Sequence, residues 1–319
     1  MTPAGTGSLM RLDGIHHISA TTADAVANLG FYGGLLGLRL GKKTVNRDDP
    51  SHYHLFYGDD AGSPGSLLTF FEYPTARRGI PGVGMVARVV WRVAGPEAIR
   101  FWEERLARAG VHAVATEVNL QFVDHEGLGL ELSVDETAAA PLVASHPEIP
   151  PEVALQGFAG VRIHAASARD SAALLDWPLG FTADSAGRLR LSGPTRSAFF
   201  DYERFDRRGR GGAGTVHHVA LTAETADIDA WQRLLAVITT PTPVVDRFYF
   251  RSIYFREPSG LLLQLATRDP GVTADEPLDQ LGRALSLPPE IEHLRSRIEA
   301  TLRPLPAFDP ASPAGAAEP

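Results

Sequence analysis

The chain contains no cysteine among its 319 residues. Disulfide bonds and thiolate metal ligands are therefore excluded, so a bound metal ion must be held by histidine, carboxylate, amide or water. The same absence is typical of proteins from a reducing cytoplasm.

Two other kinds of segment are missing as well. No apolar run approaches the roughly 20 residues of a membrane-spanning helix, and the stretch from Met1 to Met10 is too short and polar for a signal peptide. No long basic run accompanies the formal net charge of -8 and the pI near 5.8, which argues against nucleic acid and anionic membranes as partners. We expect a cytoplasmic protein that binds a small molecule or another subunit.

What is present is a repeat. With 44% hydrophobic residues the chain can bury a sizeable core, and four weakly similar units follow one another, each predicted as a strand, a helix and three strands. They begin at "GIHHISATTADAVANL", "MVARVVWRVAGPEAIRFWEERLARAGV", "GFAGVRIHAASARDSAALLDW" and "TVHHVALTAETADIDAWQRLLAV". The sequence therefore predicts an α+β fold of four βαβββ modules, paired into two open-barrel or concave-sheet units.

The boundaries of these units follow from composition. We expect an N-terminal pair of modules over 9–135, a Pro- and Ala-rich linker over 136–152, and a C-terminal pair of modules over 153–270. A helical extension over 271–305, with its helix at about 289–302, and a disordered tail over 306–319 complete the prediction.

The first strands of the four copies can be compared as an internal experiment. The first copy carries His16 and His17, the fourth carries His217 and His218, and the second and third have other residues there. The fold unit therefore does not itself require histidine at this position. Two matched doublets favour a metal site, although adjacent strand residues point to opposite faces, so only one histidine of each pair can lie squarely in the cleft.

The four-module layout, the strands "HHI" and "HHVAL" and the segment "DRFYFRSIYFREPSG" resemble the vicinal oxygen chelate superfamily, which includes glyoxalases, bleomycin resistance proteins and extradiol dioxygenases. More narrowly, they are similar to ring-cleaving dioxygenases that act on hydroquinones. The similarity covers roughly residues 12–305.

This resemblance implies an Fe(II) site whose two histidine ligands are His17 and His218. The family's third ligand is a glutamate, and here that position holds Gln264. An amide oxygen is neutral and a weaker donor, so we expect poorer metal retention. Glu131 is the counterpart in the second module, where an ion pair with Arg88 is the more economical interpretation.

The other positions implied by the resemblance are catalytic or supporting residues, namely His16, His217, Arg247 and Tyr254. Arg247 can stabilise a developing negative charge, and Tyr254 or a neutral histidine can exchange a proton. Phe248, Phe250 and Phe255 are candidates for lining the ring site. The remaining histidines, at 52, 54, 112, 125, 146 and 164, are interpreted as surface or structural residues.

The resemblance thus implies an Fe(II)-dependent, extradiol-type enzyme that opens a hydroquinone-like ring with O2. The partners would be a small aromatic substrate and O2, without nucleic acid or membrane, and the chain could form a homodimer. Two alternatives stay open: a glyoxalase-like lyase or isomerase with another divalent ion, and a non-catalytic protein that binds an aromatic compound through a degraded metal site.

Overall fold

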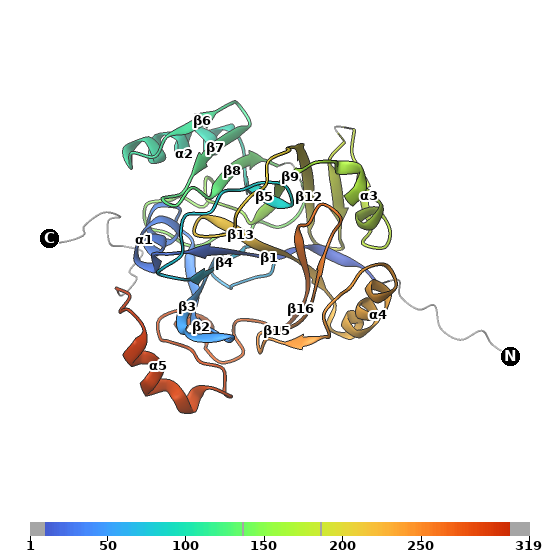
Figure 1. Ribbon diagram of the computed structural model, residues 1–319. Coiled ribbons are helices and arrows are strands. Elements are labelled where there is room, and N and C mark those ends of the chain that lie inside the picture. Colours follow the sequence, from blue (N-terminus) through green and yellow to red (C-terminus); the bar gives the residue numbers. More distant parts are fainter. Residues whose placement is uncertain (1–9, 136, 186, 307–319) are drawn as a thin grey trace.

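The computed structural model describes residues 10–135, 137–185 and 187–306. Within them, a pattern of one strand, one helix and three strands occurs four times (Figure 1). The first module comprises β1 (Leu12–Thr22), α1 (Ala25–Leu29) with a π-helical continuation (Gly30–Leu35), β2 (Arg39–Asn46), β3 (Asp49–Gly58) and β4 (Leu67–Glu72). The second comprises β5 (Met85–Val93), α2 (Pro96–Arg108), β6 (Ala113–Ala115), β7 (Asn119–Val123) and β8 (Gly129–Val134).

The third and fourth modules repeat this order. The third comprises β9 (Phe158–Ala165), α3 (Ala168–Asp176), β10 (Phe181–Ala183), β11 (Leu189–Ser192) and β12 (Ser197–Arg204). The fourth comprises β13 (Thr215–Ala223), a 3-10 turn (Thr225–Asp227), α4 (Ile228–Ile238), β14 (Val245–Asp246), β15 (Phe250–Arg256) and β16 (Leu262–Pro270). The predicted α+β fold of paired modules is confirmed.

The pairing of the modules differs from the prediction. In the described residues the strands form two eight-stranded sheets, with the orders β14-β15-β16-β13-β1-β4-β3-β2 and β10-β11-β12-β9-β5-β8-β7-β6. The first module therefore joins the fourth through β1 and β13, and the second joins the third through β5 and β9. The grouping in chain order, with pairs over 9–135 and 153–270, is wrong for the sheets, because each sheet takes strands from both sides of residues 136–152.

Alternation along the central strands separates a core face from a cleft face. Ile18 of β1 lies opposite Val219 of β13, which lies opposite Leu263 of β16, and all three are fully buried in the main apolar cluster. The residues next to them point to the other side of the sheet. Strands with a continuous core on one face therefore leave the opposite face free for polar side chains.

The helices cover the core face through their apolar stripes. In α2 the expected stripe is buried, since Ile99, Trp102 and Leu106 are all at most 3% exposed. The start of α1 is fixed by Asp24, whose carboxylate accepts hydrogen bonds from the backbone N–H groups of Val26 and Ala27.

The segment after β16 returns to the first module and packs along β2. The backbone N–H of Ser286 donates to the Lys43 carbonyl at 2.9 Å. The fully buried Lys42 forms ion pairs with Asp275, at 2.7 Å, and Glu276. The segment contains 3-10 turns (Leu278–Gln280 and Glu292–Leu294) and the helix α5 (Arg295–Thr301), which is shorter than the predicted 289–302. The tail predicted as disordered, 306–319, lies outside the described residues except for Pro306.

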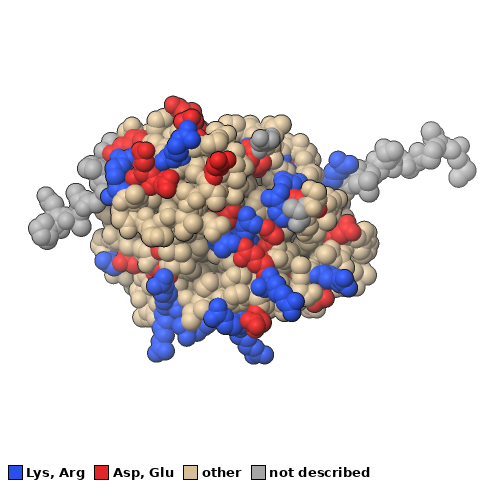
Figure 2. Space-filling view, turned by 90° about the horizontal axis from the view of Figure 1, so that it is seen from above, with Lys and Arg blue, Asp and Glu red and all other residues tan. Residues whose placement is uncertain are grey.

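No helix in the described part of the chain is long and apolar enough to cross a membrane. On the face seen from above, acidic and basic side chains lie intermixed rather than separated by sign (Figure 2).

Candidate active site

The three predicted ligands come from neighbouring strands of the first sheet, in the order β16, β13 and β1. His17 of β1 lies opposite Ala220 of β13, and Ala220 lies opposite Gln264 of β16. His218 precedes Ala220 by two residues and so points to the same side. The register therefore directs the side chains of His17, His218 and Gln264 to the cleft face.

The two histidines face each other at metal-ligand spacing. His17 Nε2 lies 3.2 Å from His218 Nε2, and both residues are buried. Two nitrogens that bind one ion at about 2.1 Å and at right angles lie about 3 Å apart. The observed separation is close to that value, so the pair fits a single metal ion.

Gln264 is an unpartnered polar residue beside this pair. It is 0% exposed, and neither its amide oxygen nor its amide nitrogen meets hydrogen-bond geometry with a partner. The amide is near enough to His17 and His218 to favour their protonated forms, which opposes part of the effect of burial on their pKa values. Buried amides are normally satisfied, so an orphaned amide here fits a ligand position.

Among the described residues no group of three His, Cys, Asp or Glu side chains converges as a metal site. The reason is that the third donor near His17 and His218 is the amide of Gln264. Two imidazoles and one amide oxygen can hold a divalent ion and leave further coordination positions open, but they supply no negative charge.

A chain of hydrogen bonds fixes which nitrogen of His17 is free. His16 Nε2 lies 3.1 Å from the backbone carbonyl of Thr267, which can only accept, so this nitrogen must donate. His16 Nδ1 is then the acceptor in a neutral ring, and His17 Nδ1, 2.9 Å away, is the donor. The lone pair of His17 is left on Nε2, the nitrogen that faces His218.

The histidines around this centre are held neutral. Burial, and then the neighbouring histidines, lower the pKa of His17 and of His218 well below its usual value. Burial and the charge of Arg268 lower the pKa of His16 to about 4. Neutral imidazoles are the form that binds a metal ion.

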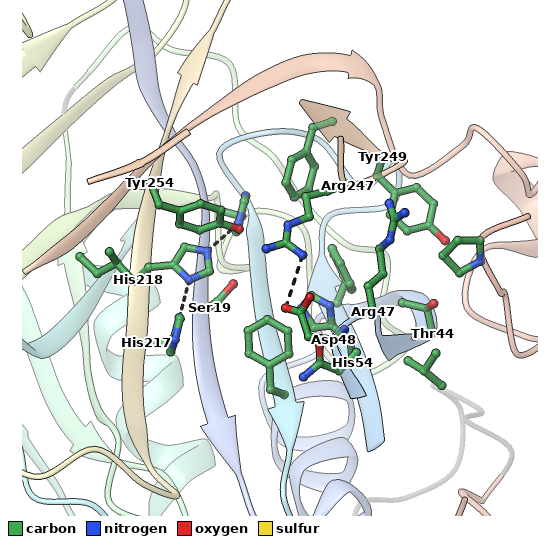
Figure 3. A pocket seen from close by; sticks show the side chains of 18 of the residues that line it. Ser19, Thr44, Arg47, Asp48, His54, His217, His218, Arg247, Tyr249 and Tyr254 are labelled. Carbon is green, nitrogen blue, oxygen red and sulfur yellow. Dashed lines mark hydrogen bonds and ion pairs between the residues drawn. The ribbon is translucent and has the colours of Figure 1, made fainter. Parts of the chain in front are cut away.

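A cavity of about 310 Å³ opens beside the histidine pair (Figure 3). His217, Arg247 and Tyr254 line it together with His17 and His218. His16 and Gln264 do not line the cavity. The aromatic residues among the lining are Phe56, Phe71, Tyr73, Tyr249, Phe250 and Tyr254.

Two charged residues bridge the cavity between opposite walls of the curled sheet. Arg247, which follows β14, forms an ion pair with Asp48 of the β2–β3 turn at 3.5 Å (Figure 3). The guanidinium of Arg247 also lies 5.6 Å from the centre of the Tyr254 ring. Its Nε is buried without a partner, so the group has capacity for a further hydrogen bond.

Of the three phenylalanines expected to line the ring site, one lines the cavity and two do not. Phe250 lines the cavity and its ring lies 5.0 Å from that of His17. Phe255 belongs to the main core on the opposite face, as the alternation of a strand requires. Phe248 has a positive φ of 72° and packs on Tyr249 outside the lining.

Sequence reasoning missed His54, which was interpreted as a surface or structural residue. It lies in β3 and lines the cavity, and its Nε2 is 3.0 Å from Thr69 Oγ1. The signal in the sequence was its period-two spacing from Phe56, which puts both residues on one face of the strand.

Glu131, the counterpart residue, lies in the other sheet and is fully buried in an ion-pair network. Arg88 lies 3.2 Å from its carboxylate and Arg162 lies 2.7 Å from it. The predicted pair with Arg88 is therefore present. Glu257 accepts hydrogen bonds from the Ser259 and Leu261 N–H groups in its own turn, so neither carboxylate is available to the histidine pair.

The family match and the similar proteins both indicate the dioxygenases of one superfamily. Residues 14–132 match the family described as Glyoxalase/Bleomycin resistance protein/Dioxygenase superfamily. The chain is 38% identical over 317 residues to "Putative ring-cleaving dioxygenase MhqA" of Bacillus subtilis, covering 93% of this chain and 100% of that protein. It is 29% identical over 315 residues to "Chlorohydroquinone/hydroquinone 1,2-dioxygenase" of Sphingobium indicum, covering 92% and 96%.

Solved structures agree with these relatives. A structure described as a "putative dioxygenase" from Bacillus subtilis superposes with a TM-score of 0.86 at 36% identity and covers 94% of this chain and 99% of that chain. Glyoxalase I from Zea mays has a TM-score of 0.57 at 13% identity, covering 82% of this chain and 93% of that chain, which is a likeness of fold.

Proposed function

The chain belongs to the Glyoxalase/Bleomycin resistance protein/Dioxygenase superfamily, as a dioxygenase enzyme, and on that premise we propose that it opens the ring of a hydroquinone with O2 in an Fe(II)-dependent, extradiol-type reaction. The hydroquinone substrate is suggested by the name of the Sphingobium relative. The cytoplasmic location and a homodimer stay predictions.

The observation that carries the proposal is the donor set beside the cavity. His17 and His218 present nitrogens 3.2 Å apart, the orphaned amide of Gln264 lies next to both, and the adjoining cavity has aromatic walls. These three residues would hold the iron. When bound, Fe(II) supplies a redox-active centre at which O2 and an aromatic alcohol can meet.

The cavity residues bind and orient the substrate. Phe250 and Tyr249 offer faces for an aromatic ring, and the mostly apolar walls exclude water. Arg247 brings a positive charge to the cavity, so it can stabilise a phenolate oxygen. The hydroxyl of Tyr254 has no partner among the described residues and can donate a hydrogen bond or a proton to an oxygen beside His218.

The proposal is tested by oxygen uptake. Protein loaded with Fe(II) under anaerobic conditions is mixed with methylhydroquinone and O2, with catechol as the control substrate and a His17→Ala variant as the control protein. We expect uptake with the hydroquinone and a ring-opened product that contains both oxygen atoms. Iron-loaded protein that consumes no O2 with either compound would overturn the proposal in favour of a binding protein or a lyase.

A further inference from the structure

A second polar group faces the cavity from the wall opposite the histidine pair. His54 lies on β3, which is separated from β1 by β4 in the sheet order. Ser19 lies opposite Thr69, and Thr69 lies opposite Phe56, so the face that carries His17 on β1 carries His54 on β3. Two strand spacings place β3 about 9.6 Å from β1 along the sheet.

Two hydroxyl groups lie between this position and the histidine pair. Ser19 Oγ lies 2.7 Å from Thr69 Oγ1, and Thr69 Oγ1 lies 3.0 Å from His54 Nε2. Ser19 itself lies opposite His218 in the sheet. A hydrogen-bonded chain therefore runs from Ser19, the cross-strand neighbour of His218, through Thr69 to His54.

The other ring nitrogen of His54 is free to bind a ligand. Nδ1 has no partner among the described residues, and His54 lines the cavity. The ring is held by stacking on Phe71, at 4.1 Å between centroids, and by Phe56, at 4.3 Å. An oriented, unpartnered nitrogen held between two aromatic rings is a specific hydrogen-bonding position.

We propose that His54 is a specificity residue whose Nδ1 binds the second hydroxyl of a para-diol. The inference rests on the proposed function, because the first hydroxyl must lie at the His17–His218 pair. A para-diol carries its two oxygens at opposite ends of the ring, so the second one points across the cavity toward β3. An ortho-diol or a simple phenol has no oxygen there and leaves His54 unpaired, which disfavours its binding.

The chain allows Nδ1 to serve either protonation state of the substrate. When His54 Nε2 donates to Thr69, the Thr69 hydroxyl donates to Ser19 and Nδ1 accepts from a hydroxyl. When Ser19 donates to Thr69 and Thr69 donates to Nε2, Nδ1 carries the proton and donates to a phenolate oxygen. Both arrangements keep both hydrogen bonds. Burial, Arg247 and His217 lower the pKa of His54 to about 3, so its ring is neutral and both arrangements are open to it.

Two matched variants separate the two nitrogens of His54. The amide of asparagine occupies the position of Nδ1, so His54→Asn keeps a polar atom toward the cavity and loses the bond to Thr69. The amide of glutamine reaches the position of Nε2, so His54→Gln keeps the bond to Thr69 and loses the atom toward the cavity.

The measurement is anaerobic binding of hydroquinone and of phenol to the Fe(II)-loaded protein, by calorimetry, so that no turnover occurs. We expect the preference for hydroquinone over phenol to fall about fivefold to tenfold in His54→Gln and to stay within about twofold of the wild type in His54→Asn. A His54→Gln variant with the wild-type preference, or an equal loss in both variants, would overturn the inference.

These binding titrations, together with the oxygen-uptake assay, keep the two proposals apart. If the wild type binds hydroquinone and cleaves it but the preference does not depend on His54, only the role of His54 fails. If the wild type prefers hydroquinone through His54 but consumes no O2, the proposed dioxygenase function fails and the recognition by His54 stands.

Discussion

Gln264→Glu restores the carboxylate that the family resemblance implies, and the surroundings of Gln264 determine its effect. The residue is fully buried beside histidines that are neutral. In the metal-free protein the new carboxyl group has no cation to pair with. Burial raises the pKa of such a group by about 2–3 units, at about 1.4 kcal/mol per unit, so the metal-free variant should lose about 3–4 kcal/mol of unfolding free energy.

Bound iron should reverse this loss. If the metal-loaded variant is about as stable as the metal-loaded wild type, the free energy lost without metal is regained on binding. A difference of about 3 kcal/mol corresponds to roughly 100-fold tighter iron binding. Thermal unfolding with and without Fe(II) measures the change in stability, and anaerobic calorimetry of Fe(II) binding measures the change in affinity.

A variant with the opposite expected effects on stability and on iron affinity serves as the control. Gln264→Met removes the orphaned amide while keeping the side chain long and flexible, so the metal-free protein should gain about 1 kcal/mol while iron binding weakens. If Gln264→Glu leaves the unfolding free energy of the metal-free protein unchanged and the iron affinity within about twofold of the wild type, the position of Gln264 at the metal is refuted.

Three further outcomes follow from other parts of the structure. His16→Phe removes the acceptor that orients its ligand neighbour, so iron affinity should fall about 10–100-fold in a calorimetric titration; an unchanged affinity contradicts the hydrogen-bond chain. Because the pKa of His54 is about 3 when folded, only the unfolded chain binds its proton between about pH 6.5 and pH 3, and this residue alone should lower the unfolding free energy of the metal-free protein by up to about 1.4 kcal/mol per pH unit in that window; urea titrations should show a profile for His54→Gln that is flatter by this amount. Glu131→Gln deprives Arg88 and Arg162 of their shared carboxylate, which should cost about 3–5 kcal/mol by chemical denaturation while O2 uptake by the folded enzyme is retained.

The placement of the histidine pair could be predicted from the chain alone because the repeats provide their own comparison. Only the first and fourth copies carry the doublet, and alternation along a strand then gives a shared face. Strand register, which the sequence did not reveal, brings Gln264 beside the pair, through Ala220.

The module pairing could not be predicted in this way. Apart from the histidine doublets, every copy presents a similar apolar face and begins with a similar strand, so the core pattern does not say which two first strands form hydrogen bonds. His54 was missed for a related reason: it occurs once, in one copy, and its importance depends on the curl of the sheet that brings β3 to the cavity. Both features are set by tertiary contacts rather than by local pattern.

The joining of β1 to β13 also has a consequence for the order in which the protein matures. The two histidines of the proposed iron site are separated by 201 positions, so the contact between them closes a long loop and contributes to a high contact order. During synthesis the second and third modules emerge consecutively and can complete their sheet while the first module still exposes the hydrogen-bonding edge of β1. The nascent chain therefore has no two-histidine site until β13, about two-thirds of the way along the chain, has left the ribosome, and metal capture is delayed until after the second and third modules have emerged.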